Sequence, residues 1–564
     1  MKMKKIITLL LVGTFLVSTF VGCNTTPADT TSGDQTTSEN GESTNSTEDG
    51  SGNTNTVSGG SEQTASGNGT GTGNGTGTSN GTGTGNGTGT GNGTSNTEQM
   101  PYYNVKSYGA KADGKNNDAP AIKKAIEAAK KNNGGIVYLP AGQYLMNSGV
   151  VVPMGVSIRG ENPETKKKWK KAEDLTGTKV SYESTGSDWL NAANFSGTWI
   201  IVNHGAGKVD SQATFQMEGN SSIYGLGFVH KGSAPITDKI TVYPPAIAIK
   251  NTKDIPYTRD GMTVENINLL NAYIGIGIQS GTGRLLDHEV GADGSSLISL
   301  GRMRAHNIRG GCVYRGIVMK GLLDTIDLDN INFGYTNFTK TYTVQRAQEC
   351  ADFEWYRADG SNVSDIFSFG AKYGILTTPA FTNGSTSMRL STAKLIGQYP
   401  MYMTATGQYE IADSTFTTID FNGLAKEKDF RAMTIIQDTT SIHQPFYLVN
   451  NCVLENKIQS ASANDYNLYL STKANATAIT LFSKLTFKGW SPDSTNPIIY
   501  YEATGAGYGG AALFQNCKAE GGNSASGMLY KAVNIPKLGL QFNACNFPKG
   551  LIDRSGASDS VVIH

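Results

Sequence analysis

Residues 100–564 predict an all-β fold in which short strands stack as a solenoid behind an N-terminal capping helix. Two observations predict it. An amphipathic helical pattern opens the segment, and short apolar runs, each followed by Asn or Gly, recur from there to the end. No helical pattern of comparable strength follows residue 132. A solenoid needs such a helix because its open first coil would otherwise expose apolar side chains and unpaired backbone.

The bulk composition excludes several classes of function. The 564-residue chain contains 69 Gly, has 17% charged residues and carries a formal net charge of zero. A neutral chain offers no electrostatic basis for binding nucleic acid, and no polybasic patch marks a lipid surface. The six Cys are spread thinly, without a CxxC pair or a His–Cys cluster. We therefore expect neither a disulfide framework nor a metal site.

Residues 1–22 predict an export signal. Three Lys within the first five residues precede an uncharged, mostly apolar run from Ile6 to Val21, which is too short for a membrane span. Cys23 follows Gly22 directly, and this junction resembles the bacterial lipobox, although Phe20 departs from the usual Leu. The resemblance implies that Cys23 is lipidated and anchors the protein to the extracellular face of the bacterial cell membrane. An ordinary secretory signal is the alternative.

Residues 23–99 predict a disordered tether. From Ser66 to Thr97 every residue is Gly, Asn, Thr or Ser, in a six-residue repeat of the NGTGTG type. A hexapeptide period can indicate a small β-solenoid. This repeat has no apolar residue to form a core, however, and cannot offset its ordering entropy. We expect a flexible spacer with a mean reach of roughly 50 Å.

The first segment of the folded domain predicts a helix and two strands. Asp118 is a suitable N-cap and Pro120 lies in the first turn. Gly134 and Gly135 end the helix. A strand is expected at 136–139, a turn at 140–142 and a second strand from 143. The helical spacing is carried by four apolar residues, Ile122, Ala125, Ile126 and Ala129.

Residues 103–146 resemble the pectate-lyase superfamily, in its rhamnogalacturonase/epimerase-like branch. The resemblance implies a single-stranded, right-handed parallel β-helix for residues 100–564. Catalytic signatures of the polygalacturonase branch and of the calcium-dependent pectate lyases are absent, so the resemblance supplies no catalytic residue. The matching positions are Tyr108, Gly109, Ala110, Asp113, Gly114, Asp118, Ala121, Ile122, Ala125, Ile126, Gly134, Gly135, Val137, Pro140, Gly142 and Tyr144.

The rest of the domain agrees with a solenoid on independent grounds. We expect Cys452, Cys517 and Cys545 to form a stacked ladder of buried, unreactive side chains. Asn tolerates unusual turn dihedrals, so a second ladder of Asn266, Asn330, Asn451 and Asn516 is expected at a turn. The recurring apolar segments lie at 222–230, 262–278, 324–333, 362–376, 446–456, 512–521 and 538–550.

One region stands out as a candidate site. Seven of the 12 Arg fall between residues 284 and 357, together with two His and many acidic residues. Arg binds carboxylates bidentately, which Lys does poorly. Neighbouring coils lie about 4.8 Å apart, so aligned carboxylates come near the separations of roughly 5–9.5 Å that glycosidases use. We therefore predict the site at 284–365.

Residues in this region receive provisional roles. Glu354 and Asp359 are the candidate acid and base, or acid and nucleophile, and Asp324 or Asp329 is the candidate second carboxylate. In a lyase, Arg357 or His306 would instead abstract the proton. Alternatively, these Asp residues only cap turns and the Arg–Asp pairs only support loops. The candidate substrate-binding residues are Arg304, His306, Trp355, Tyr356 and Arg357.

Two functional classes remain open. The first is a surface-anchored polysaccharide lyase or glycoside hydrolase acting on an acidic polysaccharide, and the second is a non-catalytic carbohydrate-binding or adhesive β-helix. An epimerase-like role is a minor third possibility. No cofactor is required, although calcium could bind because carboxylates are plentiful. We expect a monomer that contacts polysaccharide and, through Cys23, the membrane, but no nucleic acid.

Overall fold

The computed structural model describes residues 101–563 with gaps. Its contacts divide the chain into two units, Met1–Asn92 and Gly93–His564, and all described residues belong to the second. The signal, Cys23 and the tether therefore lie outside the described residues. The gaps are 166–190, 233–239, 252–260, 281–300, 321–324, 335–339, 357, 359, 379–385, 405–406, 438–444, 459–463, 474–478, 491–495, 505–509, 522–526 and 549–560.

The capping helix is present where the sequence predicts it. α1 (Ala119–Lys131) buries its apolar face, including Ile122 and Ala125, against the first coil. Asp118 holds the N-cap position, but its carboxylate caps no helical N–H. It accepts instead the backbone N–H groups of Lys111 at 2.6 Å and Ala112 at 3.1 Å. Asp118 thus fixes the loop before the helix, which agrees with the structural role expected for it.

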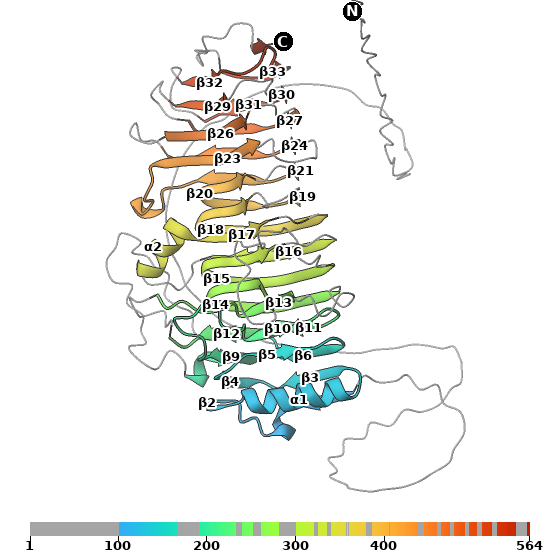
Figure 1. Ribbon diagram of the computed structural model, residues 1–564. Helices are drawn as coiled ribbons and strands as arrows, with labels where there is room; N and C mark the ends of the chain where they lie inside the picture. The colour runs from blue at the N-terminus through green and yellow to red at the C-terminus, as the bar shows by residue number, and fades with distance from the viewer. Residues whose placement is uncertain are drawn as a thin grey trace, which may run out of the picture. The chain divides into compact units, whose positions relative to one another are not determined.

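The chain beyond α1 winds into a right-handed parallel β-helix, which confirms the predicted fold. Each coil contributes to three stacked parallel sheets, here called sheets I, II and III in the order in which the chain visits them. Figure 1 shows the strands of successive coils one above the other, with α1 at the N-terminal end.

The strands belong to the sheets as follows. Sheet I contains β1 (Tyr102–Asn104), β3 (Gly135–Leu139), β6 (Val156–Gly160), β11 (Ser222–Tyr224), β19 (Thr386–Ser391), β21 (Gly407–Ala412), β24 (Phe446–Asn450), β27 (Ile479–Ser483), β30 (Ala511–Gln515), β33 (Leu540–Asn543) and β34 (Val561–Ile563). Sheet II contains β2 (Asp113–Asn117), β4 (Gly142–Met146), β9 (Thr198–Val202), β12 (Leu226–His230), β22 (Thr415–Thr418), β25 (Val453–Asn456), β28 (Thr486–Lys488) and β31 (Lys518–Glu520).

Sheet III and the strands that bend between sheets complete the helix. Sheet III contains β5 (Val150–Val152), β10 (Phe215–Met217), β13 (Ile247–Asn251), β17 (Ala351–Trp355), β23 (Asp429–Gln437), β26 (Asn464–Lys473), β29 (Pro497–Thr504) and β32 (Met528–Val533). β14 (Met262–Ser280), β15 (Met303–Met319) and β18 (Ser361–Thr377) run through all three sheets, β16 (Ile326–Phe333) through sheets I and II, and β20 (Lys394–Met403) through sheets II and III.

A single residue with positive φ makes the bend from sheet I to sheet II. All four Asn of the predicted turn ladder occupy this position, with φ between 51° and 57°, so that prediction is confirmed. Their side chains join neighbouring coils: Asn307 donates to Asn266 at 2.6 Å, and Asn451 donates to Asp413 at 2.7 Å. Asn suits this bend because its short polar side chain lowers the cost of a left-handed backbone.

The interior of the helix is a continuous apolar core. In-register aromatic rings stack from coil to coil, as in Tyr409–Tyr447 with ring centroids 5.1 Å apart and Phe482–Phe514 at 4.6 Å. Cys452 and Cys517 are buried, Cys545 is half-buried, and all three follow the bend residue of their coil. Their thiols donate to carbonyls of the preceding coil. Cys517 and Cys545 stand on neighbouring coils as predicted, but Leu485 occupies the equivalent position between Cys452 and Cys517, so the ladder is interrupted.

A few elements lie outside the regular coils. Among the described residues they are the helix α2 (Lys340–Glu349), the antiparallel pair β7 (Glu164–Thr165) and β8 (Phe195–Ser196), and the short 3₁₀ turns η1 (Val105–Tyr108), η3 (Ala192–Asn194) and η4 (Phe421–Gly423). α2 is inserted before β17 of sheet III, where Figure 1 shows it projecting from the stack. Within the described residues, no helix has the length and apolar character needed to cross a membrane.

Candidate functional site on sheet III

The outward face of sheet III carries a row of aligned side chains. Successive residues of a strand point to opposite faces, so every second residue of a sheet III strand points away from the core. We call one such set of in-register residues the sheet III row. In chain order it consists of Val318, Glu354, Leu376, Tyr402, Thr434, Tyr469, Tyr500 and Lys531.

Tyrosines dominate the middle and C-terminal part of this face. Tyr402 lies edge-on to Tyr373 and Tyr399, with ring centroids 5.3 and 5.1 Å away. Farther along, Tyr469 and Tyr500 stack at 5.4 Å. All but Tyr399 are half-buried. A half-buried phenol presents an apolar ring face and a polar hydroxyl, and this combination suits the alternating faces of a sugar ring.

Arg431 stands among these tyrosines. Asp429 accepts from its guanidinium through both carboxylate oxygens, at 3.0 Å from Nε and 2.7 Å from Nη2. The guanidinium lies over the Tyr469 ring, 3.6 Å from its centroid. The Tyr399 hydroxyl donates to Asp429 at 3.3 Å, and burial together with this carboxylate raises the pKa of Tyr399 above its usual value. Arg431 is therefore held rigidly on the open face by an acid and an aromatic ring.

A second charged group lies at the N-terminal end of the row. Glu354 is buried, and Arg315 donates to its Oε2 while the Tyr356 hydroxyl donates to its Oε1 at 2.5 Å. Lys320 lies over the Tyr356 ring, 4.1 Å from the centroid. Burial and the Glu354 carboxylate raise the pKa of Tyr356, so this phenol stays protonated. The group thus places a carboxylate, two cations and a proton donor together.

Glu354, Asp429 and Glu502 are widely spaced along the stack, whereas Glu427 lies two residues before Asp429 and pairs with Lys372. Asp429 lies on the coil of Thr434, three coils beyond Glu354 in the register, which corresponds to about 14 Å at about 4.8 Å per coil. Glu502 is two coils beyond Asp429, or about 10 Å. Glycosidase carboxylate pairs are separated by roughly 5–9.5 Å. Hence these three residues do not supply such a pair through neighbouring coils.

Metal-ligating side chains do not gather in this part of the molecule. Among the residues that the structure describes, no group of three or more His, Cys, Asp or Glu could hold a metal ion. Calcium binding remains a prediction, to be checked by adding calcium or a chelator to the assays described below.

The architecture and the first coils decide the family. The profile of the family described as "Rhamnogalacturonase A/epimerase, pectate lyase-like" matches residues 102–281. Residues 102–281 belong to the pectate-lyase-like superfamily of parallel β-helix proteins. The resemblance drawn from residues 103–146 is therefore confirmed.

Curated relatives match this pectate-lyase-like chain over short stretches. Alginate lyase 7 from Azotobacter vinelandii is 57% identical over 60 residues, which is 11% of this chain and 7% of the lyase. Mannuronan C5-epimerase AlgE1 from the same organism is 53% identical over 47 residues, 8% of this chain and 3% of the epimerase. The chain thus spans less than a tenth of either relative.

Similar solved structures include the A-module of mannuronan C-5 epimerase AlgE6 from Azotobacter vinelandii. It is 11% identical, covers 82% of this chain and 98% of the module, and has a TM-score of 0.40.

The pectate-lyase-like coils split the predicted site into two groups. Glu354 and Tyr356 lie on sheet III and face outward, as described above. Arg304, His306 and Asp329 lie on sheet I, where His306 Nδ1 and Asp329 Oδ2 are 2.9 Å apart and Ser364 donates to Asp329 at 2.7 Å. The prediction that Asp329 pairs with Glu354 is therefore wrong, because the two carboxylates belong to different sheets.

Other predicted residues are corrected or lie outside the described part. Trp355 is fully buried and packs against Phe353 in the core, so it offers no surface to a sugar ring. Asp324, Arg357 and Asp359 lie in the gaps, and their predicted roles stay predictions.

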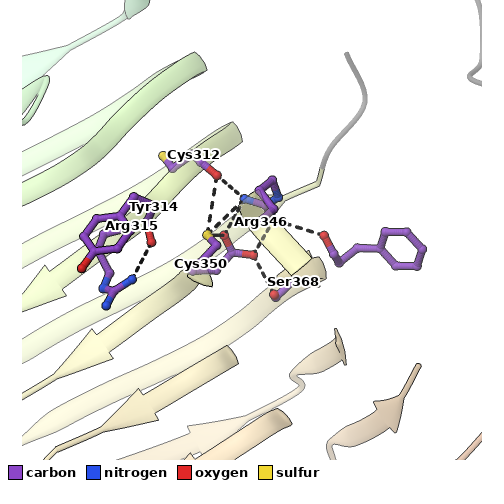
Figure 2. Close-up of polar contacts among 8 residues, drawn as sticks. Cys312, Tyr314, Arg315, Arg346, Cys350 and Ser368 are labelled. Carbon is purple, nitrogen blue, oxygen red and sulfur yellow. Dashed lines mark hydrogen bonds and ion pairs between the residues drawn. The ribbon is translucent and has the colours of Figure 1, made fainter. Parts of the chain in front are cut away.

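Arg346 is one of the seven arginines of the predicted site, but in the structure it forms a buried ion pair that has a structural role. It is fully buried on α2 and forms two 3.0 Å hydrogen bonds to the Asp352 carboxylate. It also donates to the carbonyls of Cys312 and Phe369, and Ser368 donates to Asp352. Figure 2 shows Arg346 reaching toward Cys312 and Cys350, with Arg315 lying beside the ring of Tyr314. Arg346 thus fastens α2 to sheet III.

The sequence reasoning missed the tyrosine and Arg431 part of the site. The signal was a pair of positions three residues apart that repeats from coil to coil: Tyr399 and Tyr402, then Arg431 and Thr434, then Tyr466 and Tyr469. This repeat becomes visible only when the sequences of successive coils are aligned. Loops of unequal length between the strands prevent that alignment from the sequence alone.

Proposed function

We propose that the β-helix domain is a carbohydrate-active enzyme that binds an acidic polysaccharide along the outward face of sheet III. The observation that carries the proposal is the row of half-buried tyrosines on successive coils with Arg431 fixed among them. A row of this kind repeats its contacts along the stack, as a polymer repeats its sugars.

The charges on this face support an acidic substrate. Arg431, Lys372 and Lys531 recur beside the tyrosines, although Asp429 and Glu427 pair with the first two. Guanidinium and ammonium groups bind carboxylates well when water is partly excluded. The relatives that match over short stretches, an alginate lyase and a mannuronan epimerase, favour the same substrate class.

An elimination reaction fits the described groups better than hydrolysis does. Hydrolysis by the usual route needs two free carboxylates within roughly 9.5 Å. Glu354 and Glu502 are farther from Asp429 along the stack, and the neighbouring Glu427 is paired with Lys372 at 3.0 Å. Elimination needs a base, a cation that stabilises the enolate and a proton donor. Asp429, Arg431 and Tyr399 supply these three groups within one cluster.

The test is a product assay on alginate, polymannuronate, polygalacturonate and a neutral glucan, with and without calcium. Elimination gives an ultraviolet-absorbing unsaturated sugar end, and hydrolysis gives new reducing ends without that absorbance. Binding without either product would identify the non-catalytic alternative. No binding to any of the four polymers would contradict the proposal.

The matched variants are Arg431→Ala and Arg389→Ala. Arg389 pairs with Glu410 on exposed sheet I, so its loss leaves the sheet III face unchanged. We expect Arg431→Ala to weaken polysaccharide binding at least tenfold, or about 1.4 kcal/mol, and Arg389→Ala to have no effect. Equal effects of the two variants would count against the sheet III site.

We also propose that Cys23 carries the lipid anchor and that residues 24–99 act as a spacer. Support comes from the lipobox-like junction and from the absence of apolar residues in the repeat. Incorporation of a fatty-acid analogue into the wild type but not into Cys23→Ser would support the anchor. Deletion of Ser66–Thr97 should reduce surface accessibility to antibody while leaving the domain folded.

A further inference from the structure

A pocket of about 470 Å³ lies on the outward face of sheet II, away from the sheet III row. Glu164 and Thr165 of β7 form one side of it, and the coils of β14, β15 and β16 form the other. Its volume lies in the range of small-molecule sites. The lining residues are Glu164, Thr165, Asn268, Leu270, Asn307, Ile308, Arg309, Gly310, Gly311, Asn330, Asn332 and Gly334.

Three polar side chains form the floor in register. Asn268, Arg309 and Asn332 occupy equivalent positions on three consecutive coils, about 4.8 Å apart. Arg309 is fixed by β7 because its Nη2 donates to the Pro163 carbonyl at 2.8 Å and to Glu164 Oε1 at 2.5 Å. The floor is therefore an ordered row of hydrogen-bonding groups with a neutralised charge at its centre.

The two amides of this floor are available to a ligand. Neither the Asn268 nor the Asn332 side chain has a hydrogen-bond partner within the part of the chain that the structure describes, although Asn268 is only 9% exposed. The polar atoms of Asn268 are not among the buried atoms that lack a partner, so they reach solvent and a ligand can replace that water. The ladder amides Asn307 and Asn330, which bond to each other at 3.5 Å, add further donors and acceptors at the rim.

We propose that this pocket binds a neutral sugar unit, independently of the acidic polymer proposed for sheet III. Each amide offers two N–H donors and a carbonyl acceptor, which match the paired donor and acceptor roles of adjacent hydroxyl groups. An anion is disfavoured, because Arg309 is the one cationic residue of the described pocket lining and Glu164 pairs with it, whereas sheet III adds Lys531 beside Tyr500. The ligand class is thus a hydroxyl-rich mono- or disaccharide, free or at a chain end or branch.

Saturation-transfer NMR on the full β-helix domain tests this proposal. The probes are the methyl glycosides of glucose, galactose, mannose and glucuronic acid. We expect transfer to at least one neutral glycoside, while transfer to the glucuronide should come from sheet III and be lost in Arg431→Ala. Transfer to no neutral probe, or glucuronide transfer that is lost in Asn268→Ala/Asn332→Ala instead, would overturn the proposal.

Variants locate the binding. The Asn268→Ala/Asn332→Ala double variant should abolish the transfer, and Asn332→Trp should block the pocket at an exposed position. Asn362→Ala on sheet I is the matched control, since its amide donates to Asp327 far from the pocket row. Arg431→Ala should leave the transfer to the neutral glycoside unchanged. Neutral-glycoside transfer that survives both pocket variants, or that disappears in Arg431→Ala, would contradict a separate sheet II site.

Discussion

Buried ionic groups give the sharpest residue-scale prediction. Replacing Arg346 by Leu would leave the Asp352 carboxylate buried without its cation. Breaking a buried pair by removing one partner typically costs about 3–5 kcal/mol, and we expect a loss of that order in urea unfolding. Arg389→Ala removes an exposed pair and should change stability by less than about 1 kcal/mol. An Arg346→Leu domain as stable as the wild type would show that the pair is not needed.

A buried histidine and a half-buried one predict acid sensitivity. His230 is fully buried against Tyr243, and burial together with nearby His204 lowers its pKa to about 3, while burial lowers that of His204 to about 4. Both have an ordinary value of 6.5, so the unfolded chain binds the protons more readily. Their contribution to stability is therefore full above pH 6.5 and is lost as the pH falls toward 4, by roughly 1.4 kcal/mol per unit for each histidine.

Unfolding midpoints in urea at pH 7.5 and pH 5 measure this effect. His230→Leu should show a smaller difference between the two conditions than the wild type. An identical difference in both proteins would rule out His230 as the cause. The ring nitrogens of His230 have no hydrogen-bond partner among the described residues, so nothing offsets the cost of charging this ring.

The errors at single residues share one physical cause. In the segment from Ala351 to Tyr356, apolar residues alternate with polar or phenolic ones, and this period of two predicts that Trp355 faces inward with Phe353. The prediction that Trp355 binds sugar followed the many charged residues nearby rather than this alternation. The burial of Arg346 could not be predicted from the sequence. It depends on the packing of the inserted helix α2 against β17, the strand that contains Asp352.

At the scale of elements, the bend between sheets I and II is the feature most dependent on residue type. Asn451 has a φ of 51° and donates to Asp413 in the preceding coil. Val at this position should destabilise the domain by about 1–2 kcal/mol, because a branched residue resists the left-handed region. Gly should cost less, since it adopts positive φ freely.

Thermal unfolding of Asn451→Val, Asn451→Gly and Asn450→Val tests the bend. Asn450 lies in strand β24, where Val is favoured, and serves as the control. The expected order of stability places Asn451→Val clearly lowest. If Asn450→Val were equally destabilised, the left-handed backbone would not be the reason.

Helix α1 and the turn ladder were predictable because their signals are local: helical spacing, a cap position, and Asn at a bend. Helix α2 was not predicted. Its sequence is polar, and its buried side chains Tyr342 and Arg346 do not form an apolar stripe. Its position therefore depends on tertiary contacts, above all on the Arg346–Asp352 pair, rather than on a helical hydrophobic pattern.

For the whole molecule, the parallel β-helix followed from the sequence, but the position of the site did not. Residues 284–365 are near one another along the chain, yet each coil divides its residues among three sheets. Asp329 and Glu354 therefore point from different faces. By contrast, Tyr402, Tyr469 and Tyr500 are far apart along the chain and belong to one row.

The most direct test of the central claim is a crystal structure of the β-helix domain with an acidic oligosaccharide of the polymer that it binds. We predict sugar rings on the outward face of sheet III, over Tyr469 and Tyr500, with a carboxylate near Arg431. Density for the oligosaccharide on sheet I, around His306 and Asp329, would contradict the account, as would a sheet III face that stays empty at saturating ligand.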